Sequence, residues 1–323
     1  MLTTRFTQEF GVAYPLMQGG MQWIGTGEFA AAVSNAGGLG TITALTFPTP
    51  DALAEQVRIC RDLTDRPFAV NLTTLPSINP PPYEEYRQAA VDAGARIMET
   101  SGSNPALFVD WYHERGVRVI HKATSVKHAV KAQEAGADAV IVLGFEAAGH
   151  PGELDVPSLV LLAAASRRLT VPIVAAGGFA DGRGLVAALA LGADAILLGT
   201  RLMATVETPV HPAVKDAVVA NSELDTSLIF RELSNTARVA KNTVAEEVVR
   251  RLREGADFPQ VRELVAGARG RTVYETGDLE AGIWWSGLAQ ALIDDIPTCE
   301  ELFRTIADEA SSLISGRLAS LIG

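Results

Sequence analysis

Short runs rich in β-branched residues alternate with alanine-rich amphipathic runs along this chain, at a spacing of about 25 residues between units. Such alternation is typical of consecutive strand–helix units whose strands form a parallel sheet. Eight units are present, which predicts an α/β fold of the (β/α)8 type, a closed TIM barrel. The predicted strands are residues 14–18, 40–44, 68–72, 96–99, 117–122, 139–143, 173–176 and 195–198.

The segments between these strands carry a helical pattern, and several end in a glycine that follows alanine or leucine. Glycine at this place supplies the left-handed backbone conformation that ends many helices. The predicted helices include residues 28–36, 50–60, 84–93, 126–135, 158–168 and 184–191, and the capping glycines are Gly37, Gly94, Gly136 and Gly192.

The pattern changes after Arg201, where Pro209 and Pro212 interrupt the chain and a more charged helical stretch follows. Eight strands already precede this stretch, so we expect residues 211 to about 269 to form a small inserted helical subdomain. Residues 1–210 and about 270–323 are then the barrel, and residues 299–322 are an amphipathic closing helix.

The charge balance limits the partners that this chain can bind. Its 323 residues include 38 acidic and 27 basic ones, so the formal net charge is −11. This charge repels nucleic-acid phosphates, and no run of lysine or arginine offsets it, so we expect no nucleic-acid partner. No stretch approaches the roughly 18 apolar residues of a membrane span, so we expect no membrane association. Nothing in the pattern specifies an oligomeric state.

Cysteine and histidine usage points to a reducing compartment and away from a metal site. Cys60 and Cys299 are isolated, without CxxC or metal-ligand spacing, so we expect buried thiols in a cytoplasmic protein. The five histidines show no HxH or HExxH spacing, and we expect no metal.

The active site of a TIM barrel lies at the C-terminal ends of its strands. In this chain, the residues at these places are unusually polar or rich in glycine. We take as candidates Gln18, Gly19, Gly20, Met21, Asn71, Thr73, Lys122, Ala148, Gly149, His150, Ala176, Gly177, Gly178, Gly199 and Thr200.

The loops after the seventh and eighth strands predict a phosphate site. Glycines let backbone N–H groups turn toward an anion, and the start of the following helix adds the positive end of its dipole. Sugar-phosphate enzymes use the same device, and tight turns alone would also need these glycines. No GxGxxG opens a helix after a strand and no GxxxxGK[ST] occurs, so neither a Rossmann nor a P-loop nucleotide site is indicated.

Two charged or titratable residues at the barrel mouth are candidates for chemistry. Lys122 ends an apolar strand, where an ammonium needs an anionic partner such as a flavin or phosphate. A salt bridge to a neighbouring carboxylate and a Schiff-base lysine are the alternatives. His150 lies in a glycine-flanked loop, which leaves its ring free to meet a substrate; a purely structural histidine is the alternative.

The proline-rich loop of residues 73–83 is long for a strand–helix connection, and we interpret it as a lid, with Pro76 on the substrate side. A simple exposed connector is the alternative. We place Tyr274, which opens an aromatic segment rich in glycine, on the substrate side as well.

Four segments, in order, resemble the nitronate monooxygenase family, formerly called 2-nitropropane dioxygenases. They are Pro15-Leu16-Met17-Gln18-Gly19-Gly20-Met21, residues 31–40, the loop of residues 144–152, and residues 177–184 followed by Leu198-Gly199-Thr200. The resemblance implies a non-covalent FMN whose phosphate lies on the seventh and eighth loops. It also places Gln18, Gly19, Gly20 and Thr73 near the flavin ring system, Lys122 near its polar edge, and His150 on the substrate side.

Within this family the chain is similar to a bacterial subgroup of NAD(P)H:quinone reductases. The similarity rests on Ile120-His121-Lys122, Gly144-Phe145-Glu146, residues 149–153, residues 211–215 and Gly282-Ile283-Trp284. It implies hydride transfer from NAD(P)H to FMN and two electrons passed to a quinone. Oxidation of alkyl nitronates with O2 is the alternative, and a phosphate-sugar lyase or isomerase or a non-catalytic flavin-binding protein are more remote ones.

Overall fold

A computed structural model describes residues 2–74 and 80–322. Eight parallel strands in the order β1-β8-β7-β6-β5-β4-β3-β2 form its sheet. A parallel bridge between Met17 and Leu39 joins β1 to β2 and closes the sheet, so the predicted TIM barrel is confirmed. The strands are β1 (Leu16–Gln18), β2 (Gly40–Thr43), β3 (Phe68–Thr73), β4 (Ile97–Ser101), β5 (Arg118–Ala123), β6 (Ala139–Leu143), β7 (Ile173–Ala176) and β8 (Ala195–Leu198).

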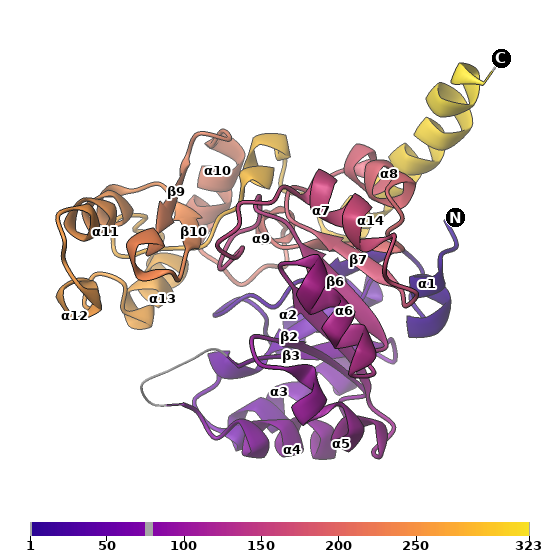
Figure 1. Cartoon of the computed structure of the whole chain (residues 1–323), viewed down its shortest axis with the longest axis horizontal. Coiled ribbons are helices and arrows are strands. Elements are labelled where there is room, and N and C mark those ends of the chain that lie inside the picture. Colours follow the sequence, from indigo (N-terminus) through magenta and orange to yellow (C-terminus); the bar gives the residue numbers. More distant parts are fainter. Residues whose placement is uncertain (1, 75–79, 323) are drawn as a thin grey trace.

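Helices surround the barrel (Figure 1). Several begin at a serine, threonine or aspartate side chain that accepts a hydrogen bond from the first turn, as Thr26, Thr49, Ser125 and Asp181 do. All four predicted capping glycines have positive φ angles, between +95° and +114°. The helices are α2 (Gly27–Asn35), α3 (Pro50–Leu63), α4 (Tyr83–Ala93), α5 (Val109–His113), α6 (Val126–Glu134), α7 (Ser158–Ala165), α8 (Gly182–Ala190) and α14 (Cys299–Ser312).

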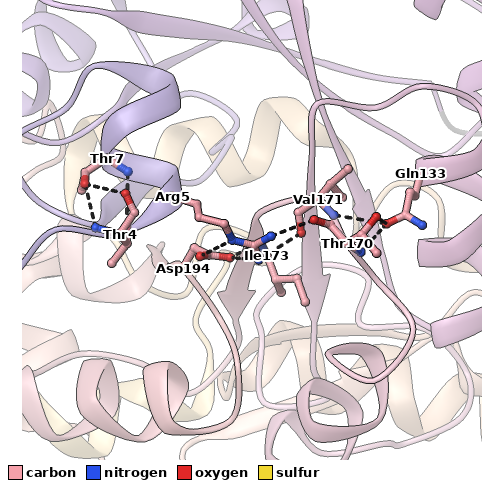
Figure 2. Close-up of polar contacts among 8 residues, drawn as sticks. All are labelled: Thr4, Arg5, Thr7, Gln133, Thr170, Val171, Ile173 and Asp194. Atoms are coloured by element: carbon pink, nitrogen blue, oxygen red, sulfur yellow. Dashed lines mark hydrogen bonds and ion pairs between the residues drawn. The ribbon is translucent and has the colours of Figure 1, made fainter.

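A short N-terminal helix, α1 (Arg5–Phe10), covers the end of the barrel opposite the strand C-termini. Its Phe6 and Phe10 are buried among the side chains that fill the barrel interior. Arg5 bonds the Asp194 carboxylate, with Nη2 2.7 Å from Oδ2, and that carboxylate accepts the Ile173 amide at the start of β7 (Figure 2). These contacts anchor α1 to the last two strands of the barrel.

Residues 229–265, within the segment after β8, form a unit beside the barrel with its own apolar core, whereas residues 202–218 pack with the barrel core (Figure 1). The segment is mainly helical, but it also contains an antiparallel pair of strands that the sequence pattern did not indicate, β9 (Thr226–Ile229) and β10 (Ala237–Ala240). Strands this short, in a charged stretch, give almost no periodic signal. The helices are α9 (Thr200–Met203), α10 (Pro212–Ala220), α11 (Thr243–Arg253), α12 (Phe258–Val261) and α13 (Gly267–Thr276), so the boundary predicted near residue 269 falls inside α13.

The C-terminal helix packs by one face and then leaves the barrel. Leu302, Phe303 and Ile306 of α14 are buried, and the helix lies against α8 and α2. A π-helical segment (Leu313–Leu318) and a 3-10 turn (Ala319–Leu321) continue the helix and project away from the body (Figure 1). Across residues 2–74 and 80–322, no helix combines the length and apolarity needed to cross a membrane.

Candidate active site

A cavity of about 880 Å³ lies at the C-terminal ends of the barrel strands. Most of the candidate residues line it together, although they come from six different strand ends. Gln18 and Ala176 do not line it, and Pro76 lies outside the described residues. The lining candidates are Gly19, Gly20, Met21, Asn71, Thr73, Lys122, Ala148, Gly149, His150, Gly177, Gly178, Gly199, Thr200 and Tyr274.

The Gln18 side chain connects two neighbouring strands of the barrel and does not line the cavity. It is fully buried, its Nε2 donates to Thr41 O at 2.9 Å, and its Oε1 accepts from Thr41 N at 3.0 Å. A glutamine amide can match a peptide group in this way because it carries one acceptor and two donors. Gln18 therefore bridges β1 and β2 at the seam where the ladder of backbone bonds is shortest.

The loops after β7 and β8 have the form of an anion cradle. Gly177 and Gly178 have φ angles of +95° and +83°, and within the described chain their amide N–H groups have no acceptor. A Cβ atom on Gly199 would meet nothing within 4 Å, so the backbone there borders open space. Unpaired amides along a glycine-rich turn are suited to phosphate oxygens, so the loops fit the phosphate of a flavin nucleotide.

Ser158 and Glu146 support the first of these loops from behind. Ser158 Oγ lies 2.7 Å from both Gly177 O and a Glu146 carboxylate oxygen, and the Ser158 amide donates to the same carboxylate at 2.9 Å. The negative charge of Glu146 is thus held by hydrogen-bond donors, which keeps it compatible with an anion nearby.

Lys122 is paired with a buried carboxylate that the sequence analysis did not single out. Its Nζ lies 2.5 Å from Glu99 Oε1, and Glu99 Oε2 accepts the Gly20 amide at 3.2 Å. Glu99 is fully buried, whereas the Lys122 side chain keeps 16% of its exposure and lines the cavity. One carboxylate on β4 therefore positions both the cation of β5 and the loop after β1. The sequence did contain a signal for this pair, namely a glutamate at the end of one predicted strand and a lysine at the end of the next.

His150 is held by a residue 86 positions further along the chain. Its Nδ1 lies 3.2 Å from Thr236 O, so the neutral ring donates from Nδ1 and presents Nε2 as an acceptor. Burial lowers the pKa of His150, which favours this neutral form near pH 7. The ring centroid lies 6.2 Å from that of Trp285, and both residues line the cavity.

The β9–β10 pair braces the loop that carries His150. Gly149 and Arg238 exchange two backbone hydrogen bonds, at 3.0 and 2.7 Å, and Thr236 donates to the Glu153 carboxylate from its amide and its hydroxyl. Arg238 also donates to Phe145 O at 3.1 Å and lies over the Phe145 ring. The inserted unit thus orients the loop that carries His150, a role for Arg238 and Thr236 that only tertiary contacts reveal.

Tyr274 lines the cavity through a mainly buried ring, which is 3% exposed. Its hydroxyl accepts the Trp285 amide at 3.0 Å, and burial raises its pKa. The phenol therefore stays protonated at neutral pH and fixes the backbone of the segment that carries Trp285.

Two histidines to which the sequence analysis assigned no chemistry also line the cavity. His121 is buried with Nδ1 2.9 Å from Thr100 Oγ1, and desolvation, assisted by Lys122 and His128, lowers its pKa to about 4. His128 lies on α6 near the rim. Among the described residues, no group of three histidine, cysteine, aspartate or glutamate side chains is placed to hold a metal ion.

Comparison with known proteins decides which family has this site. The family model for nitronate monooxygenase matches residues 3–309. The chain belongs to the nitronate monooxygenase family. Members of this family are flavin-dependent oxidoreductases that act on small molecules.

Proteins similar to this chain carry different names. An octahydroindene-carboxyl-CoA dehydrogenase of Rhodococcus jostii is 31% identical over 96% of each chain. The nitronate monooxygenase of Pseudomonas aeruginosa is 29% identical over 95% of this chain and 99% of its own. The structure of FabK from Thermotoga maritima has a TM-score of 0.92 and 34% identity, covering 99% of this chain and all of that one.

Proposed function

We propose that this member of the family is an FMN-dependent oxidoreductase, and that its activity is NAD(P)H:quinone reduction. The observation that carries the proposal is the cavity itself, in which an unpaired, glycine-rich backbone cradle and a loop histidine line the same space. FMN, when bound, supplies a carrier that accepts two electrons from one substrate and passes them to another.

The residues of this chain fit FMN better than FAD. Gly177, Gly178, Gly199 and Thr200 would hold a single phosphate, and no adenosine-binding fingerprint follows any strand. Gly19, Gly20, Met21, Asn71 and Thr73, together with Ala148 and Gly149, would lie along the ring system. Lys122 would contribute its ammonium, whose charge is largely balanced by the Glu99 carboxylate.

His150 would act on the substrate. The Thr236 carbonyl fixes the Nδ1–H tautomer, so Nε2 is left to take up a proton from water and to donate it to the quinone oxygen that becomes a hydroxyl on reduction. Since burial lowers the pKa of the ring, a proton taken up at Nε2 is readily passed on. Trp285 beside it offers an apolar face to a flat substrate such as a quinone.

The choice of quinone as acceptor is supported by the segments around Lys122, Phe145 and His150 that resemble the reductase subgroup. Oxidation of alkyl nitronates is the second candidate, and the Pseudomonas aeruginosa relative favours it. The cytoplasm is the proposed location: Cys60 and Cys299 are buried, and burial raises the pKa of each thiol to about 12, as expected of unreactive cysteines in a reducing compartment.

The decisive experiment reduces the purified protein anaerobically with NADH, NADPH and an alkyl nitronate in parallel, and then adds a benzoquinone. We expect a yellow protein that releases FMN on denaturation, is bleached by a nicotinamide and is reoxidised by the quinone. Bleaching by the nitronate alone would favour the second candidate. A colourless protein that binds no added FMN would refute both, and release of FAD would refute the single-phosphate assignment.

A further inference from the structure

One end of the cavity is lined by basic and hydroxyl side chains that neither the family comparison nor the proposed function uses. His128 and Lys131 reach it from α6, and Thr124, Ser103 and Asn104 reach it from the loops after β5 and β4. His128 and Lys131 are three residues apart on one helix, so their side chains leave neighbouring points of the same face.

This end is separate from the phosphate cradle. The barrel order places β5 two strands from β7 and three from β8, so α6 and the loops of Gly177 and Gly199 lie on different sides of the mouth. A ligand that occupies both ends must therefore span the opening. Alternatively, two ligands share the cavity, as an electron carrier and its substrate must.

The basic side chains at this end have no partner among the described residues. Within the described part of the chain, Lys131 and the His128 ring have no ion pair and no side-chain hydrogen bond. By contrast, both carboxylates that line the cavity accept hydrogen bonds, Glu146 from Ser158 and Glu153 from Thr236. Burial, with smaller contributions from Lys122 and His128, lowers the pKa of His121, which lines the cavity beside them.

A positive rim is unexpected on a chain whose formal net charge is −11. The overall field repels an anionic substrate, so local cations at the entrance are what would let one enter and stay. Lysine is a common phosphate ligand because its ammonium acts as a strong point charge.

We propose that His128 and Lys131 form an anion subsite that receives the diphosphate of a nucleotide-bearing substrate. Two sources share this chemistry, a nicotinamide dinucleotide and a coenzyme A thioester. The inference rests on the proposed function in one respect, that such a substrate reaches the cavity at all. In either case the reacting group lies near His150 and the diphosphate at α6.

The test measures dissociation constants of NADPH, NADH and free coenzyme A for the holoprotein by titration calorimetry, at several salt concentrations. Lys131→Glu should weaken at least one of these ligands by about tenfold or more and reduce the dependence of its binding on salt. Arg167→Glu is the control, because Arg167 is exposed just after α7 and does not line the cavity. His128→Gln should weaken the same ligand to a smaller extent.

A second measurement separates a local subsite from a general disturbance. The compound 1-benzyl-1,4-dihydronicotinamide carries no phosphate, so Lys131→Glu should leave its rate of flavin reduction unchanged. The inference is overturned if Arg167→Glu and Lys131→Glu have equal effects, if the phosphate-free donor is slowed equally, or if no ligand is weakened. Failure of every nicotinamide to reduce the flavin would refute the proposed reductase, while a coenzyme A effect confined to Lys131→Glu would still support the subsite.

Discussion

Oε1 of Glu99 lies 2.5 Å from Nζ of Lys122, and the two residues come from neighbouring strands of the barrel. The carboxylate is fully buried and the ammonium faces the cavity, so the pair presents a cation whose charge is largely balanced from within the protein. The salt bridge considered from sequence is therefore present, and the same lysine also lines the cavity.

Glu99→Gln tests what this balance does. The glutamine can still accept the Gly20 amide, but Lys122 becomes an uncompensated cation at the cavity. We expect the midpoint potential of bound FMN to rise, because a nearby cation favours added negative charge, and the free energy of unfolding to fall by about 1–3 kcal/mol. An unchanged potential would show that the flavin does not sense this pair.

Lys122→Met should be more damaging than Glu99→Gln. It leaves a carboxylate buried without its partner, which typically costs about 3–5 kcal/mol. The double variant Glu99→Gln with Lys122→Met removes both charges, and we expect it to recover much of that loss. Urea unfolding of the three variants measures this, and equal losses in the single Lys122→Met and the double variant would contradict the pairing as the cause.

His150→Ala should retain FMN and its visible spectrum while turnover slows by roughly 10² to 10⁴, the scale of a lost acid–base or positioning group. Flavin reduction and quinone reoxidation should be measured separately, together with nitronate oxidation. His113→Ala, on α5 outside the cavity lining, is the control and should behave as the wild type. Unchanged rates in every reaction would make His150 a structural residue.

Gly178→Leu should weaken FMN binding by at least about tenfold, because a Cβ atom there lies 3.3 Å from Glu146 Cβ and a leucine side chain would push the loop out of place. Gly178 has a φ of +83°, so part of the effect is backbone strain. Gly116→Leu is the control for strain alone, at φ +67° in open space away from the cavity. Gly199→Leu, which has negative φ and an open Cβ position, should lose FMN without that strain. FMN content and thermal unfolding distinguish these outcomes.

His121 should make stability depend on pH. Its folded pKa of about 4 lies below the usual 6.5 because the ring is desolvated and lies near Lys122 and His128. The unfolded chain therefore binds the proton first as the pH falls, so its contribution is complete above about pH 6.5 and is lost toward pH 4, at most about 3 kcal/mol. His121→Leu should lack this part of the slope in urea unfolding between pH 4 and 7; parallel slopes would rule it out.

Arg238→Met should loosen the histidine loop while keeping the packing of the side-chain stem on Phe145. The lost hydrogen bond to Phe145 O should raise the rate of amide hydrogen exchange across residues 144–153. It should also lower kcat by a larger factor than it changes KM. The exposed Arg253→Met on α11 serves as the control. Exchange that stays at the wild-type rate would show that the backbone pairing of Gly149 with Arg238 is sufficient.

Short-range patterns determined most of the barrel in advance. The predicted limits of β6, β7 and β8 agree with the structure to the residue, and the other five strands differ by one or two residues at their ends. This agreement has a physical cause, since apolar runs and capping glycines act within a few residues of one another. The sequence also located the two glycine-rich loops at the cavity, because their place follows from strand order alone.

Only the tertiary structure determined the partners of the site residues. The amide of Gln18 was expected near a flavin but is used by Thr41 across the barrel seam. His150 depends on Thr236, and no pattern near residue 150 marks a carbonyl 86 residues away as its acceptor. Such contacts exist only once the sheet has closed and the inserted unit has packed beside it, because each joins segments that local propensity treats as independent.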